Sequence, residues 1–104
     1  GRGQLFTEAL NGDIVNTMQV SILNKSAYTR RFEFRLEGRP GAELSAPEVV
    51  TIAAGERIVT PIDVSLAPNK VVQARLPFVI RVDSLDGDPV SGTISSTFIG
   101  PEQW

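Results

Sequence analysis

The chain has 104 residues, a length that suits one domain with a single hydrophobic core. Hydrophobic residues make up 41% and the formal net charge is -2, so the composition is globular and gives no electrostatic argument for nucleic acid or an anionic membrane. The chain contains neither Cys nor His. This excludes Cys or Ser–His nucleophiles, the usual zinc ligands, His- or Cys-ligated haem and cysteine-held clusters, and we expect no catalytic, cofactor-binding or metal-binding residue here.

The sequence predicts no membrane-spanning segment. Its longest purely apolar stretches, such as Ile52-Ala53-Ala54, are a few residues long, whereas a spanning helix needs about 20. The opening residues lack the apolar stretch of a signal peptide, and the chain begins without Met. We therefore expect an excised fragment or processed product whose targeting information lies upstream.

Residues 13–37 contain neither Gly nor Pro, so their length alone would permit a helix, but their periodicity indicates strands. Apolar and polar residues alternate over 17–22 and again over 28–37, which gives each run one apolar face and one polar face. The segment Asn24-Lys25-Ser26-Ala27 separates the two runs as a short connection. We therefore expect the two runs to form an antiparallel pair.

The rest of the chain repeats this pattern in four further segments. Pro61 belongs to the outward-facing set of one segment and indicates an edge position or a bulge, because proline cannot donate to a central ladder. Asp86-Gly87 is a tight-turn signal between two of the segments. The segments are 49–52, 58–66, 76–82 and 94–98. With the first pair they give six strands, and the N-terminal arm is a candidate seventh.

The predicted fold is an all-β, immunoglobulin-like antiparallel β-sandwich of about seven strands without a disulfide. The lack of a Cys…Trp…Cys arrangement excludes the antibody type. We expect at most one short helical turn, and we expect the rings of Phe34 and Phe78 to be buried between the sheets. The predicted core consists of the inward-facing residues Met18, Val20, Ile22, Tyr28, Phe32, Phe34, Leu36, Val50, Ile52, Ile58, Ile62, Val64, Leu76, Phe78, Ile80, Val82, Ile94 and Phe98.

Six short strings add a family resemblance to this fold. They are Arg2-Gly3-Gln4-Leu5-Phe6, Asn11-Gly12-Asp13-Ile14-Val15-Asn16, Gln19-Val20-Ser21-Ile22-Leu23-Asn24-Lys25, Glu37-Gly38-Arg39-Pro40-Gly41, Ala54-Gly55-Glu56 and Ser96-Thr97-Phe98-Ile99-Gly100-Pro101. In this order and spacing they resemble the C-terminal immunoglobulin-like domain of FixG-type membrane proteins. These are bacterial iron–sulfur proteins and accessory factors for assembly of cbb-type cytochrome c oxidases.

The resemblance implies a larger parent protein, with transmembrane helices and a ferredoxin-like segment whose Cys motifs hold two [4Fe–4S] clusters. The family is associated with electron transfer and with copper handling for the oxidase. None of the Cys motifs is in this chain, so no redox residue of the family carries over to it. What carries over is the fold and an appended, non-catalytic role in protein–protein contact or positioning.

The resemblance also suggests an organisation for the chain. We expect residues 1–10 to be an arm or linker from the upstream membrane region, 11–101 to be the sandwich and 102–104 to be a tail. The expected partners are other parts of the parent protein and oxidase-assembly proteins, with no nucleic acid and no small-molecule substrate. The expected location is the periplasmic side of the bacterial inner membrane.

Charged and metal-like clusters in the sequence have simpler interpretations. Asp83, Asp86 and Asp88 could hold Ca²⁺ weakly, but their spacing fails the EF-hand loop, and turn chemistry is favoured. The alternating charges over 30–39 could dock an acidic partner, but a solvated face with cross-strand charge pairs is favoured. Met18 is the single Met and has no Cys or His beside it, so core packing is favoured over copper binding.

A glycosylation sequon and a terminal tryptophan are two further features of the sequence, and two other functions are possible for a β-sandwich of this kind. Asn24-Lys25-Ser26 matches the glycosylation sequon, which we expect to be inert in a bacterial protein, and we expect Trp104 to be a frayed end. A free-standing adhesin or carbohydrate-binding sandwich is the alternative function, and it would need an exposed aromatic platform or a cation site. An enzyme would need convergent titratable groups in a cleft.

Overall fold

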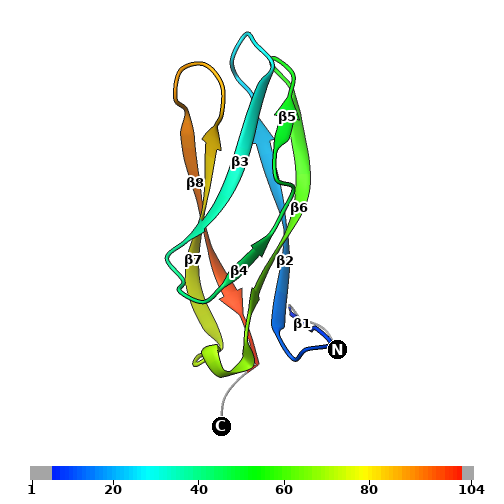
Figure 1. The fold of residues 1–104 in the computed structure, drawn as a ribbon, viewed down its shortest axis with the longest axis vertical. Coiled ribbons are helices and arrows are strands. Elements are labelled where there is room, and N and C mark those ends of the chain that lie inside the picture. Colours follow the sequence, from blue (N-terminus) through cyan, green and yellow to red (C-terminus); the bar gives the residue numbers. More distant parts are fainter. Residues whose placement is uncertain (1–5, 102–104) are drawn as a thin grey trace.

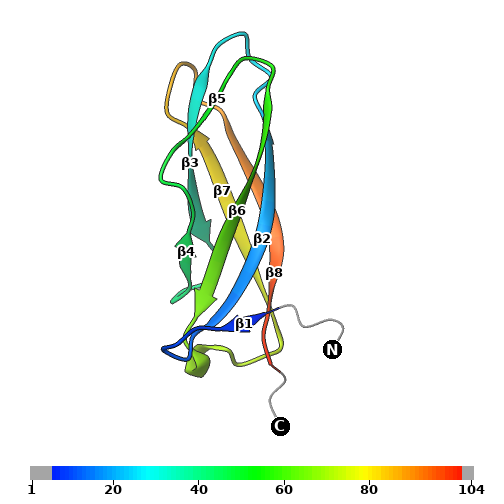
Figure 2. The same ribbon diagram turned by 90° about the vertical axis from the view of Figure 1, so that its right-hand side faces the viewer.

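The computed structural model describes residues 6–101, which form two antiparallel four-stranded sheets packed face to face (Figures 1 and 2). The strands are β1 (Thr7–Glu8), β2 (Ile14–Leu23), β3 (Arg30–Glu37), β4 (Glu43–Ser45), β5 (Val50–Ile52), β6 (Arg57–Leu66), β7 (Arg75–Ser84) and β8 (Ser91–Ile99), with one 3-10 turn, η1 (Pro68–Lys70). This confirms the all-β sandwich and the single helical turn. Between residues 6 and 101 there is no helix of the length and hydrophobicity that membrane crossing requires.

The two sheets have the strand orders β1-β2-β6-β4 and β5-β3-β7-β8. The expected pairing of β2 with β3 is therefore wrong, because these consecutive strands lie in different sheets. β2 pairs with β6 along its whole length, from Ile14 opposite Leu66 to Leu23 opposite Arg57, while β3 pairs with β7. Alternation in the sequence gives the apolar face of each strand, but both arrangements would bury that face equally well.

Two short strands extend the count to eight. The N-terminal candidate exists as β1, which pairs with β2 through Thr7 opposite Val15. β4 is not predicted from the sequence, because its three residues are too few to show an alternation. The proposed division of the chain at residue 10 stays a prediction, although β1 places part of the arm in the first sheet.

Pro61 lies in β6 opposite Gln19 of β2. On the other side of β6, β4 pairs only with residues 63–65, so the edge beside Pro61 has no strand partner within the described chain. The backbone N–H of Asn24 donates to the carbonyl of Glu56 at 2.9 Å, so these two residues form a hydrogen-bonded pair. Hydrogen-bonded and non-hydrogen-bonded pairs alternate along an antiparallel ladder, so Gln19 and Pro61 form a non-hydrogen-bonded pair and the Pro61 nitrogen points away from β2. The edge position expected for Pro61 is therefore confirmed.

The core lies between the sheets and contains most of the predicted inward residues. Phe78 is buried as expected, but Phe34 is only half-buried, because β5 pairs with residues 30–32 of β3 and leaves the edge beside Phe34 uncovered. Tyr28 is wrongly predicted, since its side chain is 74% exposed in the loop before β3. Predicted members that are partly buried against the core are Met18, Ile22, Leu36, Ile58 and Ile94, and core residues not predicted are Ile14, Leu66 and Val71.

The molecule is elongated, with extents of 52 × 28 × 22 Å. β1 and the C-terminal end of β8 lie at one end of the long axis (Figure 1). The loops between β2 and β3, between β5 and β6 and between β7 and β8 lie at the other end, which we call the distal end and define as residues 24–29, 53–56 and 85–90.

Candidate interaction site at the distal end

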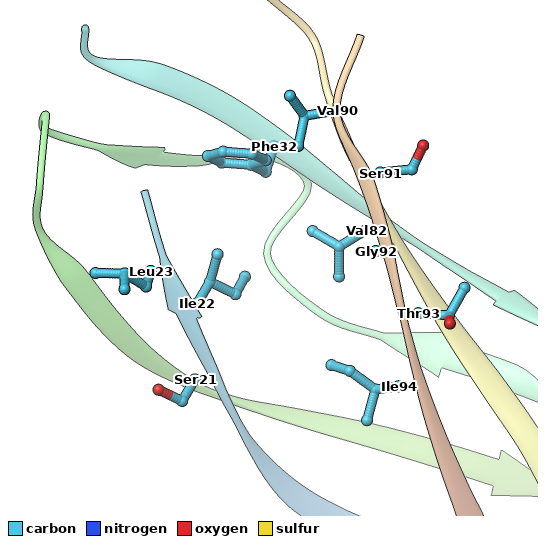
Figure 3. Close-up of a pocket in the computed structure, with 10 residues that line it drawn as sticks. All are labelled: Ser21, Ile22, Leu23, Phe32, Val82, Val90, Ser91, Gly92, Thr93 and Ile94. Carbon is cyan, nitrogen blue, oxygen red and sulfur yellow. The ribbon is translucent and has the colours of Figure 1, made fainter. Parts of the chain in front are cut away.

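Three hollows adjoin at the distal end because they share lining residues. The first, of about 250 Å³, lies between β2 and β8, where Ile22 and Val82 face one another beside Phe32 and Ile94 (Figure 3). The second, of about 370 Å³, shares Phe32 and Val90 with the first and extends to Arg30. We call the three hollows together the distal groove, and the first of them is lined mainly by apolar side chains.

The third hollow of the distal groove lies over the tips of two loops. Its volume is about 390 Å³, and it shares Arg30 with the second hollow. Tyr28 and Thr29 line it from one loop and Asp86 lines it from the other. The groove therefore runs from an apolar end between the sheets to a polar end beside an exposed aromatic ring.

Asn24 holds the loop that carries Tyr28. Its side chain is only 2% exposed, and its Nδ2 donates to the carbonyls of Tyr28 and Ile52 at 2.7 and 2.9 Å. Its Oδ1 accepts from the backbone N–H of Ser26 at 3.0 Å. The nitrogen of the sequon is thus buried and hydrogen-bonded, and its bonds position the loop against the end of β5.

Exposed apolar side chains form the rim of the distal groove. Leu23 and Val90 are exposed above the first two hollows, and Tyr28 stands beside the third. Exposed apolar side chains that gather beside a hollow make this end of the molecule the candidate interaction surface. The alternation of the sequence predicts a core position for Tyr28 and gives no sign of a surface role for Leu23 or Val90; the turn residues just before Tyr28 are the signal that it lies outside a strand.

Arg31 fastens the loop between β7 and β8 to β3. Its backbone N–H donates to Asp86 Oδ2 at 2.9 Å, and its Nη2 donates to Asp86 Oδ1 at 2.7 Å. The side-chain hydrogen bond is the main cause that lowers the pKa of Asp86 and raises the pKa of Arg31. Arg30, the neighbouring residue of β3, donates through Nη2 to the carbonyl of Asp88 in the same loop at 2.8 Å. Two arginines of β3 therefore hold the loop between β7 and β8.

Gly87 confirms the predicted Asp86-Gly87 turn. Its φ of +65° lies in the region that side chains other than glycine rarely adopt. A Cβ placed there would also lie 2.7 Å from Nη2 of Arg30. The positive φ therefore favours glycine at this position, whereas the arginine head group, at the end of a flexible side chain, could move aside.

Two of the three aspartates singled out in the sequence, Asp83 and Asp86, bind different arginines through their carboxylates, whereas Asp88 accepts from Arg30 through its backbone carbonyl. Asp86 is held by Arg31, while Asp83 Oδ1 accepts from Arg81 Nε at 3.0 Å and Asp83 Oδ2 lies 3.7 Å from Arg35 Nη2. Within residues 6–101 no three His, Cys, Asp or Glu side chains are grouped so that they could hold a metal ion. The Arg35–Asp83 pair between β3 and β7 is a cross-strand charge pair of the kind expected, and the solvated role of this face stays a prediction.

The remaining sequence candidates lie away from the distal groove. Met18 packs against the core, as favoured by the sequence analysis. Trp104 lies outside the described residues.

The fold and its groove define an immunoglobulin-like β-sandwich with a candidate binding surface at one end. Residues 1–101 match the family described as "IG-like fold at C-terminal of FixG, putative oxidoreductase", and the chain belongs to this family. It is similar to the crystal structure of a FixG-related protein from Vibrio parahaemolyticus, with a TM-score of 0.74 and 20% identity over 95% of this chain and 88% of that chain. At this identity the likeness shows the fold alone. A comparison with curated proteins gave no match.

Proposed function

We propose that this chain is a non-catalytic contact and positioning domain of a FixG-type protein, and that the distal groove is its contact surface. The observation that carries the proposal is the exposed apolar rim of Leu23, Tyr28 and Val90 around an apolar hollow. Covering exposed apolar side chains with a partner removes their surface from water, which contributes favourably to the free energy of binding. The loops that carry them are fixed by Asn24 and by the two arginines, so little ordering is required on binding.

The resemblance to FixG-type proteins extends the proposal to the parent protein. The parent holds two [4Fe–4S] clusters in its upstream part, and its helices anchor it in the inner membrane with this domain on the periplasmic side. Its role is assembly of a cbb-type oxidase and the copper handling that accompanies it. The partners of the domain are other parts of the parent and oxidase-assembly proteins. Tethering raises the effective concentration of a neighbouring partner, so a groove of modest affinity is sufficient.

The first experiment removes the apolar rim within the full-length parent protein. Leu23→Ser with Val90→Ser is expected to lower the amount of assembled oxidase while cluster content, measured by iron and acid-labile sulfide, stays unchanged. Val59→Ser is the control, because Val59 is more exposed than Leu23 and Val90 but points outward from β6, away from the groove. Equal oxidase levels in both variants would contradict the groove as a contact surface.

A second experiment addresses the domain as a whole and its side of the membrane. Deletion of residues 11–101 from the parent is expected to leave the clusters intact and to lower oxidase assembly or parent abundance. Loss of the clusters would contradict the division of roles. Reporter fusions at the C-terminus that are active in only one compartment test the membrane side, and a cytoplasmic result would overturn the periplasmic placement.

Carbohydrate binding is the second candidate function, and the exposure of Tyr28 is the observation that favours it. Its ring lines a hollow together with Arg30 and Asp86, and an aromatic face beside hydrogen-bonding groups suits a sugar ring. Glycan-array binding by the chain that is lost in Tyr28→Ala would support this function. Absence of binding by the unmodified chain would exclude it.

A further inference from the structure

β8 is a long strand at the edge of its sheet. The other edge strands, β1, β4 and β5, have only two or three residues, whereas β8 has nine. β8 contains no charged residue and no proline. Natural proteins commonly protect exposed edges by short length, charge or proline, and β8 has none of these protections.

The ladder between β7 and β8 shows which backbone groups of β8 are free. Gly100 N–H donates to the carbonyl of Ala74 at 3.0 Å, and Ser84 N–H donates to the carbonyl of Val90 at 2.9 Å. Both bonds belong to even-numbered residues, and hydrogen-bonded pairs recur at every second residue of an antiparallel ladder. The even-numbered residues of β8 therefore bond to β7. The residues whose N–H and C=O point away from β7 are Ser91, Thr93, Ser95, Thr97 and Ile99.

Ile99 shows that this free edge is competent to pair. Asn16 Nδ2 donates to the Ile99 carbonyl at 2.8 Å, and Ile99 N–H donates to Asn16 Oδ1 at 2.7 Å. The side-chain amide of Asn16 therefore occupies the place that one residue of a neighbouring strand would take. Within residues 6–101, the outward groups of the remaining four residues, 91, 93, 95 and 97, have no backbone partner.

We propose that the free edge of β8 pairs antiparallel with β8 of a second copy of this chain, around a two-fold axis at Ile94. In this register Ser91 pairs with Thr97 of the partner copy, and Thr93 pairs with Ser95 of the partner copy. All four free residues then exchange both of their hydrogen bonds. The two second sheets join into one continuous sheet across the axis.

The chemistry of β8 suits its own copy in particular. A two-fold interface places the same surface on both sides, so a charged edge would meet its own charge, and β8 carries none. On its outer face the pairs would be Ser with Thr, whose hydroxyls stabilise each other across strands. On the inner face the two Ile94 side chains, partly buried in the isolated chain, would meet at the axis.

The test uses two charged variants of the 104-residue chain, Thr93→Lys with Ser95→Lys and Thr93→Glu with Ser95→Glu. In the proposed register each variant places like charges opposite one another in its own dimer and opposite charges opposite one another in a mixed dimer. By light scattering and sedimentation, the unmodified chain is expected to be a dimer and each variant a monomer. An equimolar mixture of the two variants is expected to restore the dimer.

The matched control places two positive charges on β2, whose edge is covered by β1 only at Ile14 and Val15. Gln19→Lys with Ser21→Lys changes two exposed residues of β2 at the same spacing and is expected to leave the dimer intact. An unmodified chain that stays a monomer at roughly 1 mM would overturn the proposal. So would a mixture of the charged variants that stays monomeric, or loss of the dimer in the β2 control. Residues 91–94 of β8 also line the first hollow of the distal groove. The rim variant Leu23→Ser with Val90→Ser separates the two proposals, because it leaves residues 91–97 unchanged and is expected to keep the dimer.

Discussion

Arg31 binds Asp86 through both its backbone and its side chain, at 2.9 Å and 2.7 Å. One carboxylate thereby joins the start of β3 to the loop after β7, two segments that are far apart in the sequence. Both side chains are partly exposed to water, so the pair acts by orienting the loop.

The Arg31–Asp86 pair predicts a loss of stability in acid. Its hydrogen bonds lower the folded-state pKa of Asp86 below the ordinary value of 3.8. A depressed carboxylate pKa stabilises the folded state above the unfolded pKa, and this contribution is lost as the pH falls through the folded pKa. Urea unfolding is expected to show a stability difference between the unmodified chain and Asp86→Asn at neutral pH that shrinks below about pH 4. A difference that is constant across this range would contradict the assignment.

Phe78 and Phe34 predict two different costs of truncation. Phe78 is buried between the sheets, so Phe78→Ala is expected to lower the free energy of unfolding by roughly 3–5 kcal/mol. Phe34 is only half-buried and already contacts water, so Phe34→Ala is expected to cost clearly less. Chemical denaturation of both variants measures the difference. Equal losses would show that the edge beside Phe34 is covered in solution.

Asn24 predicts a large effect from a small polar change. Asn24→Ala removes the side-chain hydrogen bonds to the carbonyls of Tyr28 and Ile52, and each lost bond costs roughly 0.5–1.5 kcal/mol. The carbonyl of Tyr28 keeps a second donor, Ser26 Oγ at 3.0 Å. We expect a fall in the midpoint of thermal unfolding. Lys25→Ala, in the same loop but exposed, is the control and is expected to change the midpoint little. Similar midpoints for both variants would mean that the loop is held by other contacts.

The lack of Cys and His predicts that this chain does not retain transition metals. Hard oxygen ligands and one thioether bind iron, copper and zinc weakly compared with thiolate and imidazole. Elemental analysis after dialysis is expected to find each of these metals far below one per chain. One firmly held metal ion per chain would contradict the placement of redox chemistry upstream.

The strands of this fold could be predicted where alternation was long enough to see. Ten residues of β6 and eight of β3 each show one apolar face, which is the pattern of a half-buried strand. The partner of β2 could not be predicted, because hairpin pairing and crossing to the other sheet bury the same face. β4 is too short for a period, and it forms because Leu44 meets Val64 across the ladder.

The distal groove was beyond sequence reasoning for a different reason. Its rim brings Leu23 from β2 beside Val90 from the loop before β8, residues that no local pattern connects. Tyr28 continued the alternation of β3 backwards, but the side chain of Asn24 holds that stretch as a loop. The absence of Cys and His, in contrast, limited the chemistry of the chain without any structure.

Asn16 also acts as a stop on the edge of β8. Because its amide already takes both backbone groups of Ile99, an incoming strand can run along β8 only as far as Thr97 before it meets a side chain in its path. A single buried asparagine thus limits how many residues of an added strand can pair with β8. Shortening it to alanine would lengthen the open edge by one pairing position and loosen the choice of register.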